Sequence, residues 1–147
     1  MKVVADTNVL VSGLLWGGPP NRILRWARDG VLAMLACEET LGELKTVMRY
    51  DRLSSRLSAL ETTPEEMVAY AMNLMRFVPT PKKIPKTIAK DPFDNIFLAI
   101  ADQHRAGLII SGDHHILDLQ IYIKIPIVTP SEAAAVVRRL GRSANSR

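Results

Sequence analysis

Short apolar segments alternate with amphipathic segments along most of the chain, and this alternation constrains the fold more than any other feature. The apolar segments are residues 2–5, 31–36, 108–111 ("LIIS") and 127–129 ("IVT"). The segments between them have helical spacing of apolar residues, as in "EETLGELKTVMRY" and "TPEEMVAYAMNLMRF". Strands separated by helices predict an α/β fold of three layers, with a parallel sheet covered on both faces.

Capping residues place several helix ends. Asn21 is expected to cap a helix that ends at Gly30, and Thr63 to cap a helix with Pro64 at its first position. "VPTPKKIPKTIAK", with three prolines and four lysines, is expected to be a loop within one domain. The last helix is expected to run from Pro130 to about Leu140. We therefore expect one domain over residues 1–140 and a disordered basic tail over residues 141–147.

The bulk composition is that of one globular domain. The chain has 147 residues, of which 48% are hydrophobic and 23% are charged. Cys37 is the only cysteine, so no internal disulfide is possible and a reducing cytoplasm is expected. No apolar run approaches the roughly 18 residues that a membrane span needs. The net charge of +4 permits an anionic partner such as nucleic acid without requiring one.

Acidic residues stand where the predicted strands and helices meet. Asp6 interrupts the apolar stretch "VVADTNVLVSG", and Asp113 follows the strand "LIIS". Asp94 lies in the first turn of the helix that begins "DPFD", and Glu43 lies on the helix after the second strand. Ligands of parallel sheets bind beyond the carboxyl ends of the strands, so these four carboxylates are expected to line one crevice. Cations would be needed to keep them ionised together, and all-oxygen ligation favours Mg²⁺ or Mn²⁺.

Each acidic residue also has a purely structural explanation. Asp91 before Pro92 is a good helix cap, and Asp113 could cap a short helix. The helix dipole alone would also explain Asp94. Glu43 alone could be a solvated helix charge, and Asp6 could mark a strand exit. The case for a site depends on the convergence of the set. Other chemistries lack support, because the histidines do not have zinc-ligand spacing and no phosphate-binding glycine loop is present.

The ordered set "VVADTNVLVSGL", "CEETLGELKTVMR", "DPFDNIFLAIA", "LIISGDHHILDL" and "IVTPSEA" resembles PIN-domain ribonucleases. Within that family it resembles the VapC-like toxin components of bacterial toxin–antitoxin systems. The resemblance spans nearly the whole chain and weakens between about residues 52 and 85. It implies a PIN-like fold of three α/β/α layers around a central parallel sheet of about four to five strands.

The resemblance also implies a set of site residues. The family's acidic quartet falls on Asp6, Glu43, Asp94 and Asp113 as catalytic and metal-binding residues, supported by Asn8, Ser111 and, as a possible fifth acid, Asp91. Two positions depart from the family pattern. Cys37 replaces a common serine cap before the glutamate, and Gly42 adds backbone freedom next to Glu43.

The expected function is a Mg²⁺- or Mn²⁺-dependent endoribonuclease, the toxin of a toxin–antitoxin pair. Its expected partners are RNA, a cognate antitoxin and a second copy of the chain in a homodimer. Two alternatives remain open: a catalytically inactive PIN-fold binding module, and a structure-specific DNA nuclease. Basic residues expected to bind RNA are Lys45, Arg49, Arg52, Arg56 and the lysines of residues 82–90.

Overall fold

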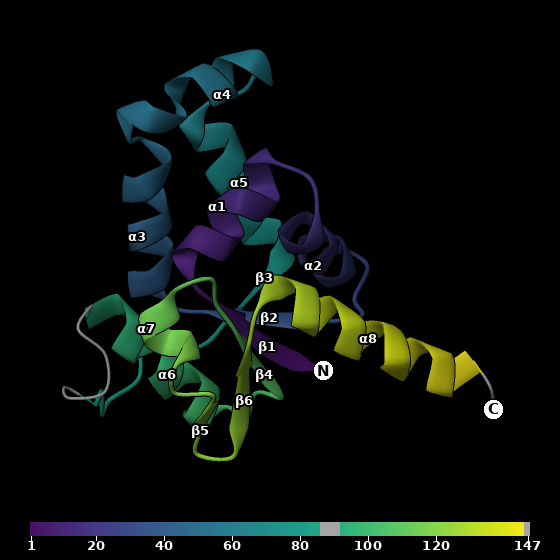
Figure 1. Cartoon of the computed structure of the whole chain (residues 1–147). Coiled ribbons are helices and arrows are strands. Elements are labelled where there is room, and N and C mark those ends of the chain that lie inside the picture. Colours follow the sequence, from purple (N-terminus) through teal and green to yellow (C-terminus); the bar gives the residue numbers. More distant parts are fainter. Residues whose placement is uncertain (86–91, 146–147) are drawn as a thin grey trace.

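A six-stranded sheet forms the centre of the computed structural model, which describes residues 1–85 and 92–145 (Figure 1). The strand order is β3-β2-β1-β4-β6-β5. All neighbouring strands are parallel except β5 and β6, which are antiparallel. The strands are β1 (Lys2–Ala5), β2 (Ala33–Ala36), β3 (Met75–Phe77), β4 (Leu108–Ile110), β5 (Ile121–Tyr122) and β6 (Ile125–Val128).

Helices connect the parallel strands and cover both faces of the sheet. They are α1 (Thr7–Leu15), α2 (Pro19–Arg28), α3 (Glu38–Met48), the 3-10 helix η1 (Asp51–Leu53), α4 (Ser54–Ala59), α5 (Pro64–Leu74), α6 (Pro92–Gln103), α7 (His114–Leu117) and α8 (Pro130–Asn145). Within the described ranges, no helix combines the length and the apolar character that a bilayer crossing needs.

Alternate residues of the central strands face two separate cores. Val3 and Ala5 of β1 pack with residues of α1, α2, α3, α5 and α8, whereas Val4 between them packs with α6 and α7. β4 repeats the pattern, with Ile110 in the first core and Ile109 in the second. Because both faces of these strands are buried, their residues are apolar throughout, as parallel sheets require. The predicted three-layer α/β/α fold is confirmed.

The sheet has more strands than the predicted four to five. β3 was expected to be the end of a helix reaching Phe77, but the helix α5 ends at Leu74 and the chain then pairs with β2. β5 belongs to a hairpin with β6 that the sequence did not indicate. Residues 51–59, for which the sequence predicted no element, form η1 and α4.

Helix ends also differ from the predicted ones in places. Asn21 lies inside α2 rather than at its cap, and its side-chain amide donates to the carbonyl of Gly13 at 2.9 Å. α8 continues to Asn145, so the segment predicted to be a tail is helical as far as that residue. The division into a domain over 1–140 and a tail remains a prediction. Thr63 caps α5 as predicted, accepting from the backbone N–H of Glu66 at 3.1 Å.

The strand order places the end of β1 beside the end of β4. Ala5 is paired with Ile110, so Asp6 and Ser111 leave the same edge of the sheet side by side. The backbone N–H of Asp6 donates to the carbonyl of Ile110 at 3.1 Å and fixes this register. The polar residues that follow the neighbouring strands β1 and β4 therefore lie next to each other.

Candidate active site

Asp6 is held in place by three groups that donate to its carboxylate. It is the N-cap of α1, and Oδ1 accepts from the backbone N–H of Val9 at 2.9 Å. Oδ2 accepts from the hydroxyl of Ser111 at 2.5 Å, and the backbone N–H of Gly112 donates as well. Asp6, between the end of β1 and the start of α1, is thus both a helix cap and a carboxylate of fixed orientation at the edge of the sheet.

The pKa of Asp6 is raised above its ordinary value, chiefly because burial disfavours the charged carboxylate. The negative charge of Asp113 raises it further, while the hydrogen bonds from Ser111 and the backbone lower it and only partly compensate. Asp6 and Asp113 are therefore close enough to repel each other. A cation bound between or beside the two carboxylates would offset both the cost of burying the charge and the repulsion between them.

Asp113 reaches Asp6 through the turn that follows β4. The hydroxyl of Ser111 donates to Asp6 and accepts from the backbone N–H of Asp113 at 3.0 Å, so one side chain orients both residues. Asp113 also caps α7, accepting from the N–H of His115 at 2.8 Å. Capping occupies Oδ1 and is compatible with a second role for the carboxylate, since each carboxylate has about four acceptor positions.

Glu43 joins the site through a residue that the sequence analysis did not single out. Its Oε2 accepts from the hydroxyl of Thr7 at 2.6 Å, and Thr7 is buried directly after Asp6. Glu43 is half-buried on α3, so it is not a fully solvated helix charge. The signal for Thr7 was its position between Asp6 and Asn8, but its partner lies 36 residues away and could not be inferred locally.

The start of α3 is fixed despite the cysteine at its cap. The backbone N–H of Cys37 donates to the hydroxyl of Thr40 at 2.9 Å, and that hydroxyl donates back to the carbonyl of Cys37 at 3.0 Å. Thr40 therefore supplies the N3 half of a capping box whose N-cap residue is Cys37. The helix that carries Glu43 is therefore capped with a cysteine at the N-cap position.

No metal-sized group of three acids occurs among the described residues, and the predicted quartet as a whole stays a prediction. Asp94 is half-buried in the first turn of α6, as predicted, but no three His, Cys, Asp or Glu side chains of residues 1–85 and 92–145 are close enough to hold one metal ion. Asp91 lies outside the described residues. Asp6 and Asp113 do lie close enough to interact.

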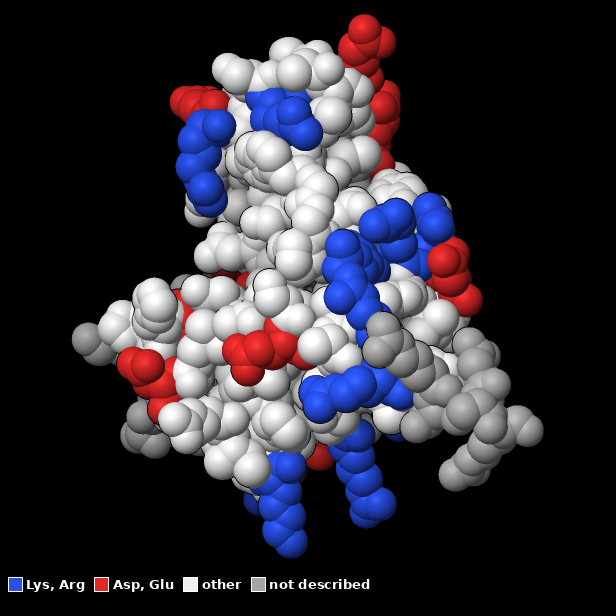
Figure 2. All heavy atoms as spheres, turned by 45° about the vertical axis from the view of Figure 1, so that its right-hand side comes forward, with Lys and Arg blue, Asp and Glu red and all other residues white. Residues whose placement is uncertain are grey.

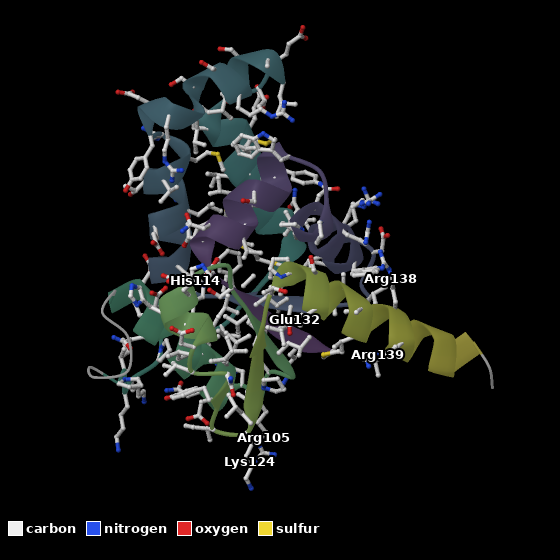
Figure 3. The ribbon with its side chains drawn as sticks, in the orientation of Figure 1. Arg105, His114, Lys124, Glu132, Arg138 and Arg139 are labelled. Carbon is white, nitrogen blue, oxygen red and sulfur yellow. The ribbon has the colours of Figure 1, made fainter. Side chains whose placement is uncertain are left out.

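A pocket of about 490 Å³ opens beside this pair. It is bordered by the first turns of α1, α2, α7 and α8, and Asn8 lies exposed on its wall, as a supporting residue would. In Figure 3, the labelled His114 and Glu132 mark the beginnings of α7 and α8. The lining residues are Asn8, Val9, Ser12, Pro20, Gly112, Asp113, His114 and Pro130.

Comparison with known proteins agrees with this fold. A family model described as "PIN domain" matches residues 2–115, which include Asp6, Glu43, Asp94 and Asp113. No curated protein matches the chain. Members of the matching family are generally metal-dependent nucleases. Since the match covers well over half of the sequence and the three-layer fold agrees with it, the chain belongs to the PIN-domain family.

Proposed function

We propose that this chain is a metal-dependent endoribonuclease and the toxin component of a toxin–antitoxin pair. The observation that supports it most is the pairing of Asp6 with Asp113 beside a pocket of about 490 Å³, in a chain of the PIN-domain family. RNA is the proposed substrate because single-stranded phosphates can enter a narrow acidic cleft.

The donor atoms suit Mg²⁺ or Mn²⁺. Mg²⁺ in proteins commonly keeps several waters and is held by one or two carboxylates together with substrate phosphates, so a pair of carboxylates is a sufficient protein contribution. Asp6 and Asp113 would hold the ion, with Asp94 and Glu43 as additional acids around it. When bound, such an ion supplies Lewis acidity and a water of lowered pKa.

The residues of the chain have separate tasks in this proposal. Ser111 orients the Asp6 carboxylate by donating to it, and it holds the backbone of Asp113 by accepting from its N–H. Thr7 holds Glu43, which we propose positions the attacking water. Asn8 on the pocket wall offers an amide that can donate to a phosphate oxygen.

Cleavage of labelled RNA tests the proposal. Wild type should cut single-stranded RNA with Mn²⁺ or Mg²⁺ and be inactive in chelator, and Asp6→Asn and Asp113→Asn should both abolish cleavage. Asp102→Asn is the matched control, since Asp102 is an exposed acid near the end of α6, and it should keep full activity. Preference for DNA of the same sequence would favour a DNA nuclease, and binding without cleavage would favour an inactive binding module.

The toxin role has its own test. A small open reading frame beside this gene, encoding a protein that co-purifies with the chain and suppresses its cleavage of RNA, is expected. A chain that cleaves RNA but has no such neighbour would remain a nuclease and would lose the toxin assignment.

A further inference from the structure

Five arginines lie on two helices that both begin at the rim of the candidate active site. Arg22, Arg25 and Arg28 belong to α2, and Arg138 and Arg139 belong to α8. Pro20 in the first turn of α2 and Pro130 at the start of α8 both line the pocket beside Asp113. Both helices therefore lead away from the site with basic residues along them.

The arginines form one surface rather than two. α2 and α8 contact each other, and Arg22, Arg25 and Arg28 follow one another at the three-residue spacing that places side chains on one side of a helix. Figure 3 shows Arg138 on the edge of α8 toward α2 and Arg139 on its other edge, and Figure 2 shows Lys and Arg side chains gathered over this part of the molecule. We call Arg22, Arg25, Arg28, Arg138 and Arg139 the arginine face.

Most of these guanidinium groups are available to a ligand. Arg25, Arg28, Arg138 and Arg139 are exposed. Among residues 1–85 and 92–145, the only acidic side chain within ion-pair distance of the face is Asp29, at 3.1 Å from Arg28. That pair is exposed on both sides, so a phosphate can compete with it.

Several basic residues expected to bind RNA are, by contrast, engaged within the protein. Arg49 pairs with Glu65 at 2.8 Å, and Arg56 donates to the carbonyl of Leu15 at 2.7 Å while stacking over Trp16. Arg52 lies over the ring of Tyr50. The exposed guanidinium groups of the arginine face, by contrast, stand on two helices that begin at the pocket.

We infer that the arginine face binds the sugar–phosphate backbone of an RNA strand whose neighbouring phosphate occupies the pocket at Asp113. This inference rests on the proposed function for the identity of the ligand. At a rise of about 1.5 Å per residue, Arg28 and Arg138 lie about 12 Å along their helices from the two prolines at the pocket. A strand of a few nucleotides can span that length, and guanidinium groups bind phosphates in two-pronged geometry. The face offsets the repulsion between an acidic pocket and a polyanion.

Binding of a 30-nucleotide single-stranded RNA in chelator tests the inference without any cleavage. The double variant Arg25→Glu with Arg139→Glu should bind at least about tenfold more weakly than wild type. Each lost phosphate contact lowers the slope of log affinity against log salt by about 0.7, so the slope should fall by about 1.4. The matched control is Arg105→Glu with Lys124→Glu, which changes the same charge near the β5–β6 hairpin, away from α2 and α8, and should bind like wild type (Figure 3).

Equal losses in the two double variants, or no loss in the first, would overturn the inference. The inference would also fail if poly-glutamate displaced the RNA at an equal concentration of negative charge. The arginine face would then suit an acidic protein rather than RNA. Melting temperatures of both variants should match wild type, and the single variants Arg25→Gln and Arg139→Gln serve where a reversal unfolds the chain.

A cleavage assay separates this inference from the proposed function. With Mn²⁺, the first double variant should show a raised KM and an unchanged kcat on the 30-nucleotide RNA, and unchanged cleavage of a dinucleotide that cannot reach the face. If no variant cleaves RNA but the binding difference persists, the nuclease proposal fails and the RNA-binding face stands. If cleavage depends on Asp6 but RNA binding is unchanged by the arginine substitutions, the nuclease proposal stands and the RNA-binding face fails.

Discussion

A carboxylate that is enclosed by protein and faces a second carboxylate keeps its charge at a cost in free energy. Asp6 is in this position, since both burial and Asp113 raise its pKa. Three hydrogen-bond donors hold the Asp6 carboxylate nonetheless. A carboxylate with only a capping role would gain nothing from the negative charge of Asp113 beside it. The arrangement is one in which a metal ion, rather than the fold, would supply the missing stabilisation.

Asp6→Asn is therefore expected to stabilise the protein in chelator at pH 7. The amide removes the buried charge and can still accept from Val9 and donate to Ser111. Each 1 kcal/mol of relieved repulsion should raise the melting temperature by about 2 to 4 °C. Thermal melts of wild type, Asp6→Asn and the control Asp102→Asn measure this, and the control should melt like wild type.

The pH dependence of the same difference has a definite sign. The pKa of Asp6 in the folded chain lies above the ordinary value of 3.8, so the native state retains a proton that the unfolded chain has already released. The associated stability is present below about pH 4 and is lost as the pH rises through the raised pKa. The advantage of Asp6→Asn over wild type should accordingly be small at pH 4 and largest at pH 7.

Added Mn²⁺ should reverse the order of the two proteins. Wild type should gain about 2.7 kcal/mol when free Mn²⁺ is a hundredfold above its dissociation constant, because only the native state binds the ion. Asp6→Asn should gain much less. A variant that melts below wild type in chelator and still gains fully from Mn²⁺ would contradict a metal site at Asp6.

The positions of residues that directly follow a strand were predictable from the sequence. Asp6 and Ser111 follow two apolar strands, and their proximity requires only that those strands be neighbours, which the register of β1 and β4 satisfies. The link between Thr7 and Glu43 was not predictable, because it depends on how α3 packs against α1. The convergence of all four acids on one crevice, expected from the ends of the strands, stays a prediction, since no three of them are close enough in the described part of the chain to hold one metal ion.

At the scale of elements, the errors have local causes. The residues of β3 continue the apolar spacing of α5, and only pairing with β2 makes them a strand. The hairpin of β5 and β6 turns at Ile123 and Lys124, with φ of 45° and 67°, where glycine or asparagine is usual. Without those turn residues, the sequence carried no hairpin signal. Tertiary pairing decided both elements.

The crossing of α1 and α2 depends on Gly13. A Cβ at this position would lie 2.8 Å from the carbonyl oxygen of Pro20 and 2.6 Å from Cδ1 of Leu24. Leu24 can rotate, but the backbone of Pro20 moves only if α2 moves. Since Pro20 also lines the pocket, the spacing of these helices and the shape of the site are coupled.

Gly13→Ala is expected to destabilise the chain although alanine favours helices. Overpacking costs about 1 to 3 kcal/mol and the gain in helix propensity returns up to about 1 kcal/mol, so the melting temperature should fall by several degrees. Gly17→Ala is the control, because nothing lies within 4 Å of a Cβ there. Equal melting temperatures for the two variants would mean that α2 adjusts freely.

At the scale of the whole molecule, the helices α3 and α5 present a surface that the fold itself does not cover. A groove of about 310 Å³ runs between them, bordered by Lys45, Arg49, Val68 and Met72. Met72 is 42% exposed, whereas Met67 on the same helix packs against the core. A flexible methionine at a groove between two helices suits a protein partner, and the family resemblance predicts a homodimer.

Met72→Glu should therefore separate assembly from folding. If the proposed homodimer uses this groove, wild type should have twice the mass of the chain by light scattering at micromolar concentration. Met72→Glu should be a monomer with a nearly unchanged melting temperature, because the side chain is exposed. Met67→Glu should lower the melting temperature by burying a charge against the core. A wild type that stays monomeric, or a Met72→Glu variant that stays dimeric, would show that this groove does not join two copies.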